Sequence, residues 1–277
     1  MDSTKAGVLA QLQHKVSLFR VPNFFHFTVG EFHHDKDNIL RKVSKMFHST
    51  IVVRSSSIFE DGSTVSSAGE FESILNIDSA DRSAVLNAID TVIESYSHKK
   101  ADNNQIIIQE MVKSSTMSGV IFTHDLNAGA PYYVINYDDQ SGSTDTVTSG
   151  SSEYSNRTLY IHRNATNKLH SDRFVNLLEA VQELEKIVNS QFLDIEFALG
   201  EDLTPYLLQV RPITTKSNWN RSVTKRIDKT LDGVQSFLKD RLKRIDGVYG
   251  KTTVLGQMPD WNPAEMIGRA PRALATS

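Results

Sequence analysis

Apolar residues recur along the chain at helical spacing in some stretches and in short dense runs in others. Steps of three and four residues predict helices at residues 5–15, 37–46, 82–96 and 173–188. Runs rich in β-branched and aromatic residues predict strands at residues 24–29, 50–53, 71–77, 106–112, 118–125, 131–139 and 158–163. This mixture of helices and strands predicts an α/β fold.

A β-hairpin is predicted where residues 193–199 and 206–212 read as two strands joined by a turn at 200–205. Beyond it, residues 218–246 predict a charged helix with a narrow apolar stripe. Such a helix is either a connector packed on the body or an oligomer contact. Residues 255–277 are rich in proline and glycine and look like the start of a further domain.

Length and composition narrow the classes of protein. The 277 residues allow either two lobes or one large domain, and a formal charge of −3 gives no reason to expect nucleic acid or an anionic membrane as partner. The absence of cysteine excludes disulfides, thiol catalysis and thiolate metal sites, and it fits a reducing compartment. Because neither a signal peptide nor a membrane-spanning run is recognisable, we expect a cytoplasmic protein.

A strand that ends in Arg54 leads into a loop rich in serine and glycine. A guanidinium presents a planar fork of donors to phosphate oxygens, and small residues let backbone N–H groups approach closely. The pattern therefore suits a polyphosphate. Serine-rich loops are common, however, and the same residues also fit an ordinary surface loop.

Polar side chains mark the predicted hairpin. Asp194 and Glu196 share one face of the first strand, and Gln209 and Arg211 share one face of the second. A carboxylate with an amide oxygen suits Mg²⁺ and an arginine suits phosphate. Cross-strand ion pairing on a solvated face explains the pattern equally well. We expect the opposite face to carry the apolar residues Ile195, Phe197, Leu208 and Val210.

The histidines predict little. None of the nine has the spacing of a helical zinc site, and we expect none to be catalytic. His124, in the stretch FTHD, is the one that we expect to face a cleft.

Several segments carry a specific resemblance. They are STKAGVLAQL, VVRSSSIFEDGSTVSSAGEFESILNI, IIIQEMVKSSTMSGVIFTHD and LDIEFALGEDLTPYLLQVRPIT, and they span most of residues 1–214. In order and spacing they resemble the nucleotide-binding domain of phosphoenolpyruvate synthase and pyruvate phosphate dikinase. That family implies a two-lobed ATP-grasp fold that holds ATP and Mg²⁺. The implied parts are an N-terminal lobe at 1–105, a C-terminal lobe at 106–215, and a connector helix with the start of a truncated domain at 216–277.

The resemblance also implies roles for individual residues. The phosphate contacts are Lys5, Arg54 and Arg211, and the loop over the triphosphate carries Ser66, Ala68 and Gly69. The hinge that addresses adenine through its backbone consists of Gln109, Glu110, Met111 and Val112. The metal ligands are Glu196 and Gln209, with Asp194 as the partner acid.

Departures from the family pattern narrow the resemblance. The family's FTRDP is FTHDL here, so His124 replaces an arginine, and NYDDQSGSTDTVTSG replaces an acidic, glycine-rich stretch. With VPNFFHFTVGEF and GQMPDWNPAEMIG, this variant is similar to a subgroup found with surface-polysaccharide genes. Its characterised type, L-glutamine kinase, phosphorylates the glutamine amide nitrogen on the way to phosphoramidate-modified capsules. Whole enzymes of this kind carry a relay histidine in a later domain whose motif is missing here, so we expect a fragment or a separate histidine-bearing partner.

These observations support competing hypotheses. The first is an ATP-dependent phosphotransferase that passes a phosphoryl group toward a relay histidine and then to a small acceptor, with the L-glutamine amide nitrogen as the candidate. The second is a non-catalytic nucleotide-binding module that docks or regulates a partner through residues 219–245 and the tail. The third is a kinase whose small substrate takes the phosphoryl group directly.

Overall fold

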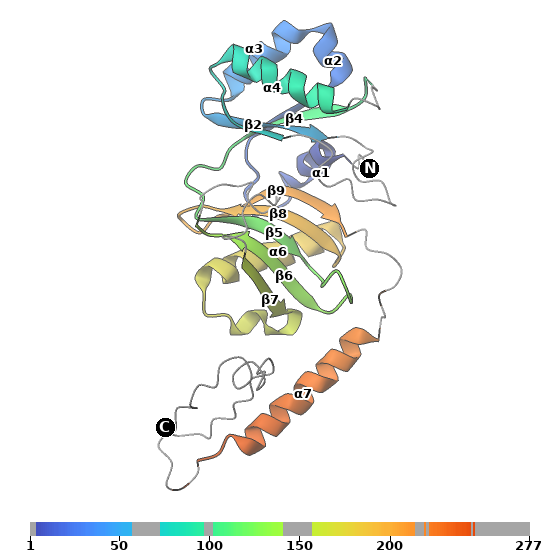
Figure 1. Ribbon diagram of the computed structural model, residues 1–277, viewed down its shortest axis with the longest axis vertical. Helices are drawn as coiled ribbons and strands as arrows, with labels where there is room; N and C mark the ends of the chain where they lie inside the picture. Colours follow the sequence, from blue (N-terminus) through green and yellow to red (C-terminus); the bar gives the residue numbers. More distant parts are fainter. Residues whose placement is uncertain are drawn as a thin grey trace, which may run out of the picture. The chain divides into compact units, whose positions relative to one another are not determined.

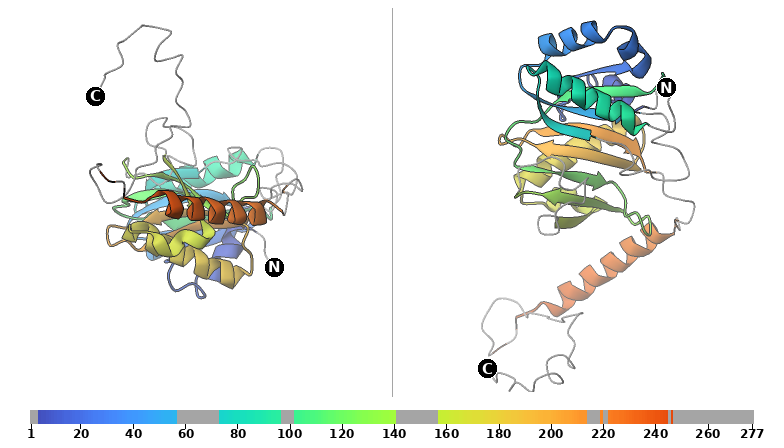
Figure 2. Two further views of the ribbon diagram at one scale, coloured as in Figure 1. Left: turned by 90° about the horizontal axis from the view of Figure 1, so that it is seen from below. Right: turned by 45° about the horizontal axis from the view of Figure 1, so that its top comes forward.

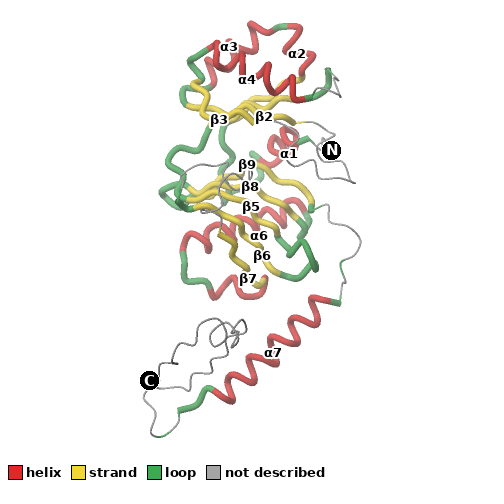
Figure 3. Tube along the Cα trace, viewed as in Figure 1, coloured by secondary structure: helices red, strands yellow, loops and turns green. Residues whose placement is uncertain are grey.

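The computed structural model describes residues 4–56, 73–96, 102–140, 157–213, 219, 222–244 and 246. The chain divides into two compact units, Met1–Arg221 and Ser222–Ser277. The first unit contains two antiparallel sheets, whose strands are yellow in Figure 3. Because one hydrophobic core lies between the first sheet and its helices and another is centred on the second sheet, this unit has the two-lobed α/β architecture expected from the sequence.

The first sheet has the strand order β1-β4-β2-β3. Its strands are β1 Phe24–Thr28, β4 Gln105–Glu110, β2 Thr50–Ser56 and β3 Ser73–Asp78. Helices α2 Val29–His34, α3 Lys36–Met46 and α4 Arg82–Ser95 cover one face of this sheet (Figures 1 and 2). Alternate strand residues such as Val53 and Ile108 point into the core beneath these helices, because side chains alternate along a strand.

Helix α2 follows β1 directly, which the expected strand at residues 24–29 did not anticipate. The Thr28 hydroxyl accepts from the Glu31 N–H at 3.1 Å, and the Glu31 carboxylate accepts from the Thr28 N–H at 2.7 Å. This reciprocal capping box starts the helix. The Thr-x-x-Glu spacing that signals it is visible in the sequence.

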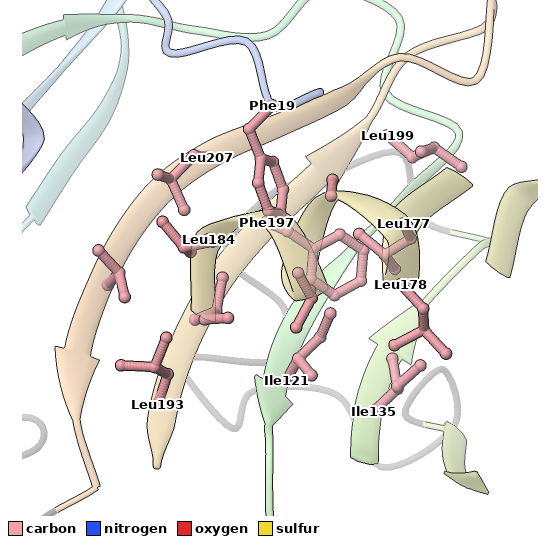
Figure 4. Packing of buried hydrophobic residues seen from close by; sticks show 14 of the residues in the cluster. Phe19, Ile121, Ile135, Leu177, Leu178, Leu184, Leu193, Phe197, Leu199 and Leu207 are labelled. Atoms are coloured by element: carbon pink, nitrogen blue, oxygen red, sulfur yellow. The ribbon is translucent and has the colours of Figure 1, made fainter. Parts of the chain in front are cut away.

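The second sheet has the strand order β7-β6-β5-β8-β9. Its strands are β7 Arg157–His162, β6 Tyr132–Asp138, β5 Met117–Phe122, β8 Leu193–Leu199 and β9 Pro205–Pro212. The short 3-10 helix η1 Arg163–Lys168 and helix α6 Asp172–Val188 follow β7. Helix α6 packs on one face of the sheet and seals a core in which Ile121, Leu177 and Phe197 are fully buried (Figure 4).

Helix α1, Lys5–Leu12, belongs to the second lobe by its side chains although it comes first in the chain. Ala6, Leu9 and Leu12 are buried in the same core as the residues of α6. The helix ends earlier than the predicted residue 15, because the Lys15 N–H donates to the Leu12 carbonyl in a tighter closing turn.

The boundaries between the parts fall later than expected. Strand β4 pairs with β1 and β2, so the two sheets divide between β4 and β5 rather than at residues 105 and 106. Strand β2 does not end at Arg54 but continues through Ser56. The second unit begins at Ser222, where the sequence placed the change at residue 216.

The second unit contains helix α7, Val223–Arg241, which is shorter than the predicted helix at 218–246. No residue of α7 is buried, and Leu231, Val234 and Phe237 of its apolar stripe are exposed. Among the helices that the structure describes, none combines the length and the apolar character needed to cross a bilayer.

Candidate functional site

A pocket is formed jointly by the first sheet, the segment that leaves it and the hairpin of the second sheet. Strands β2 and β3 contribute Val52, Arg54 and Leu75, residues 109–112 all take part in the lining, and the hairpin contributes Glu196 and Leu208. We call residues 109–112 the hinge segment. Three stretches that are far apart in the sequence therefore meet around one cavity.

Arg54 reaches from the first sheet to the hairpin of the second. Its Nη2 lies 2.5 Å from Glu196 Oε2 and 3.4 Å from Gln209 Oε1. The Arg54 and Glu196 side chains are only 16% and 17% exposed, so bulk water screens their attraction weakly. A carboxylate oxygen and an amide oxygen thus converge on one cationic atom, and oxygens that converge in this way also suit a divalent cation.

The register of the hairpin sets the predicted polar residues in facing pairs. Glu196 lies opposite Gln209, and a register shift follows between Glu196 and Phe197. The shift leaves an extra residue in β9, so Leu207 rather than Leu208 faces Phe197 and enters the core. Leu208 lines the pocket, and the prediction that it lies on the apolar face was wrong.

Asp194 and Arg211 form the other facing pair. Arg211 Nε donates to Asp194 Oδ2 at 2.7 Å, and the Asp194 side chain is 9% exposed. Cross-strand ion pairing, the competing interpretation of the hairpin, is therefore present, but at a buried carboxylate rather than on a solvated face. The contact holds Arg211 on the strand face that also carries Gln209.

The charges around Glu196 keep it ionised. Burial alone would raise its pKa, but the Arg54 guanidinium, assisted by Lys5 and Arg211, lowers the pKa below its ordinary value. Lys5 lies in the first turn of α1, so its influence shows that this helix start faces the same region. The three cations that the resemblance assigns to phosphate therefore act on a single carboxylate.

The hinge segment is held in place by its neighbours. Glu110 Oε1 accepts from Ser49 Oγ at 2.9 Å, and Oε2 accepts from Asn23 Nδ2 at 3.1 Å. The backbone N–H groups of Glu110 and Met111 donate to the carbonyls of Asn23 and Thr50. These bonds fix the path of the chain past the pocket.

Gln109 carries an unsatisfied polar atom in the pocket wall. The residue is 1% exposed, and no acceptor for its Nε2 lies among the residues that the structure describes. A buried donor without an acceptor costs about 1–3 kcal/mol. The pocket therefore favours a ligand with a hydrogen-bond acceptor near Gln109.

Most of the predicted site residues are found together. Arg54, Glu196 and the hinge segment line the pocket, and Gln209 contacts Arg54. The predicted triphosphate loop residues Ser66, Ala68 and Gly69 lie outside the described residues. The roles of all these residues remain predictions.

His124 does not line this pocket, and the expectation that it faces a cleft stays a prediction. It is 6% exposed, its ring lies 4.6 Å from that of Phe192 and 6.1 Å from that of Trp219, and its Nδ1 is 3.0 Å from the Gln191 carbonyl oxygen. Burial, with the charge of Arg163, lowers the pKa of His124 to about 4. His124 is therefore a neutral packing residue.

Three apolar residues of the pocket wall were not predicted from the sequence: Val52, Leu75 and Leu208. A signal for Val52 was available, because a residue two positions before Arg54 in a strand shares its face. Leu75 precedes Asn76, which has a positive φ of 58°, in a strand whose pairing with β2 is irregular. No feature of the sequence predicted that irregularity.

Comparison with known families gives one match. Residues 31–138 match the family model described as pyruvate phosphate dikinase, AMP/ATP-binding domain. The matched stretch contains Arg54 and the hinge segment, stops before the hairpin, and covers less than half of the chain. Comparison with curated protein sequences gives no match.

Several solved structures are similar at low identity. D-Alanine-D-alanine ligase from Helicobacter pylori has a TM-score of 0.42 and 10% identity, with 84% of this chain and 57% of that chain covered. D-Alanine–D-alanine ligase from Bacillus anthracis complexed with ATP has a TM-score of 0.41 and 13% identity, with 83% and 60% covered. A RimK domain protein ATP-grasp from Sphaerobacter thermophilus has a TM-score of 0.40 and 9% identity, with 84% and 62% covered. The chain thus spans about three fifths of these proteins, and such distant likenesses assign no function.

Proposed function

We propose that this chain is an ATP-grasp nucleotide-binding domain that holds ATP with Mg²⁺ between its two lobes. The observation that carries the proposal is the shared pocket. Arg54, the hinge segment and Glu196 come from separate sequence blocks that were each expected to bind the same nucleotide, and they line one cavity. The family match over residues 31–138 supports the same proposal.

The pocket offers suitable surroundings for an adenine base. Val52, Leu75 and Leu208 would pack against the faces of the base, while its polar edge would meet the backbone of the hinge segment. The unsatisfied Nε2 of Gln109 would then donate to a ring nitrogen of the base. These contacts would contribute affinity for the nucleoside part of ATP and not for its phosphates.

The basic residues suit the triphosphate. Lys5, Arg54 and Arg211 would offset its negative charge, and Asp194 would keep Arg211 oriented. Glu196 and Gln209 would hold Mg²⁺ through the two oxygens that now approach Arg54. Two protein oxygens are enough, because Mg²⁺ commonly completes its shell with phosphate oxygens and water. When bound, the ion would neutralise charge on the phosphates.

The reaction that we propose is phosphoryl transfer from ATP toward a relay histidine and then to a small acceptor. The histidine would belong to a continuation of this chain or to a separate partner. The resemblance to phosphoenolpyruvate synthase implies AMP and phosphate as products. The resemblance of residues 21–32 and 256–268 to the L-glutamine kinase subgroup makes the amide nitrogen of L-glutamine the acceptor to test first.

Two measurements on the full chain test this function. Isothermal titration calorimetry with ATP and Mg²⁺ measures binding, and chromatography of the products, with and without a histidine-bearing partner domain, measures AMP release. We expect magnesium-dependent binding of ATP, and AMP formation that requires the histidine. If wild-type chain binds no ATP in the presence of Mg²⁺, the proposal is wrong.

One observation favours a second candidate, a nucleotide-binding module that docks a partner without catalysis. The apolar stripe of α7 leaves Leu231, Val234 and Phe237 between 41% and 54% exposed. Binding of ATP without AMP release, even when the histidine-bearing domain and L-glutamine are present, would favour this second candidate.

A further inference from the structure

A network of buried hydrogen bonds joins the start of α1 to the end of β2. Ser56, the last residue of β2, accepts from the Ala6 N–H through its Oγ at 3.1 Å. The Tyr96 hydroxyl accepts from the Ser56 N–H at 3.0 Å and donates to the Gln105 carbonyl at 2.6 Å. Thr4 Oγ1, which caps α1, donates to Gln105 Oε1 at 2.9 Å. We call these five residues the Tyr96 network.

The Tyr96 network is shielded from water. Thr4, Ser56 and Tyr96 are 1%, 0% and 3% exposed. Hydrogen bonds in such surroundings are strong, and a polar group that loses its partner there is left unsatisfied at considerable cost. The network therefore holds its members in one arrangement.

The network lies beside the two cations that come from opposite lobes. Lys5 stands between Thr4 and Ala6, on a helix whose side chains pack in the core of the second lobe. Arg54 precedes Ser56 by two residues, on a strand of the first sheet. The bond between Ala6 and Ser56 is thus a direct tie between the backbone that carries Lys5 and the strand that carries Arg54.

We propose that Tyr96 is a positioning residue for the triphosphate, whose hydroxyl acts through Ser56 to fix Lys5 and Arg54 relative to each other. The inference rests on the proposed function, because it takes both cations as phosphate contacts. Tyr96 is not among the residues that line the pocket. Side chains that are held in place before binding lose little conformational entropy when a polyphosphate binds. The affinity for the polyphosphate is therefore higher.

A purely structural role for Tyr96 predicts a different result. Tyr96 also belongs to the core of the first lobe, so its loss affects stability in either case. A structural defect would weaken the binding of all nucleotides to the same extent, or of none of them. A positioning defect would weaken the binding of ATP, which engages both cations through its outer phosphates. It would leave the binding of AMP unchanged, because AMP lacks those phosphates.

The test compares ATP and AMP binding to the full chain by calorimetry in the presence of Mg²⁺. In Tyr96→Phe we expect the Kd for ATP to rise about tenfold, since two buried bonds are lost, while the Kd for AMP stays within about twofold. The matched control is Tyr133→Phe. Tyr133 is also buried and donates one hydrogen bond, to Glu185 at 3.0 Å, in the core of the second lobe. We expect this variant to bind both nucleotides as the wild type does.

A second variant covers the case in which Tyr96→Phe does not fold. Ser56→Ala removes the acceptor of the Ala6 N–H, and we expect the same selective loss of ATP affinity. Equal losses for ATP and AMP in these variants, or no loss for ATP, would overturn the inference and leave the proposed function intact. A wild-type chain that binds neither nucleotide would overturn both.

Discussion

Replacement of Arg54 by alanine should raise the pKa of Glu196 and destabilise its ionised form. In the wild type, Arg54 is the main influence that lowers the pKa of Glu196, against the opposing effect of burial. Arg54→Ala removes that influence, so the pKa of Glu196 should rise, with only Lys5 and Arg211 left to oppose the effect of burial. The variant must either carry a poorly compensated buried charge or take up a proton.

The structure sets the size of this effect. Removal of one partner from a fully buried ion pair costs about 3–5 kcal/mol. The Arg54 and Glu196 side chains are 16% and 17% exposed, and Gln209, Lys5 and Arg211 remain nearby, so we expect a loss of about 2 kcal/mol at pH 7. In the wild type the ionised Glu196 contributes stability above the unfolded pKa of about 4.3, and this contribution is lost as pH falls through the lower folded pKa. The difference between variant and wild type should therefore be smaller at pH 4 than at pH 7.

Urea unfolding followed by circular dichroism at pH 7 and at pH 4 measures both differences. The double variant Arg54→Ala, Glu196→Gln should regain most of the lost stability at pH 7, because its buried side chain carries no charge. Arg82→Ala is the control, since its pair with Asp37 is 56% and 79% exposed and should contribute less than about 1 kcal/mol. An Arg54→Ala variant that loses the same stability at both pH values, or that Glu196→Gln fails to rescue, would refute this reasoning.

Further predictions concern turnover, packing and pH. Glu196→Ala should abolish AMP formation in the presence of the histidine-bearing domain while the melting temperature stays within a few degrees; wild-type turnover would contradict the site assignment. Gly129→Ala should cost about 1–3 kcal/mol and shift the tryptophan emission, because a Cβ there would lie 2.5 Å from the Trp219 ring and the φ is +66°; unchanged emission and stability would count against the Gly129 packing. His124, with its pKa lowered to about 4, binds protons less readily when folded than when unfolded, so stability should fall by about 3 kcal/mol as pH drops from 6.5 to 4. His124→Phe should remove this loss of stability from the pH dependence of the urea midpoint. An unaltered pH profile would argue against the role given to His124.

The hairpin could be predicted from the sequence because its information is local. Strand β8 begins and ends at the predicted residues, and the side chains two apart do share a face. The extra residue in β9 could not be predicted, since β-bulges depend on how the two strands settle against the core. That single irregularity moved Leu208 from the expected core position to the pocket.

The sequence pattern could not predict which lobe each element packs against. The amphipathic spacing of α1 indicates a helix with a buried side, but the spacing does not reveal that Leu9 packs with α6 in the second lobe. Ser56 ends a strand and Tyr96 follows the last residue of a helix, and neither residue stands out in the sequence. Only the fold brings them together. The resemblance to a known family pointed to Lys5 and Arg54, yet it gave no indication of what holds them.

The site residues lie outside the hydrophobic cores, so we expect substitutions at the site to leave the fold intact. The two hydrophobic cores contain none of Arg54, Glu196 or Gln209. The contacts among these three residues are an ion pair and a hydrogen bond. Substitutions there alter an electrostatic balance of a few kcal/mol, whereas the apolar burial that determines each lobe is left in place. On the proposed function, we therefore expect Glu196→Ala to lose nucleotide turnover while both lobes stay folded.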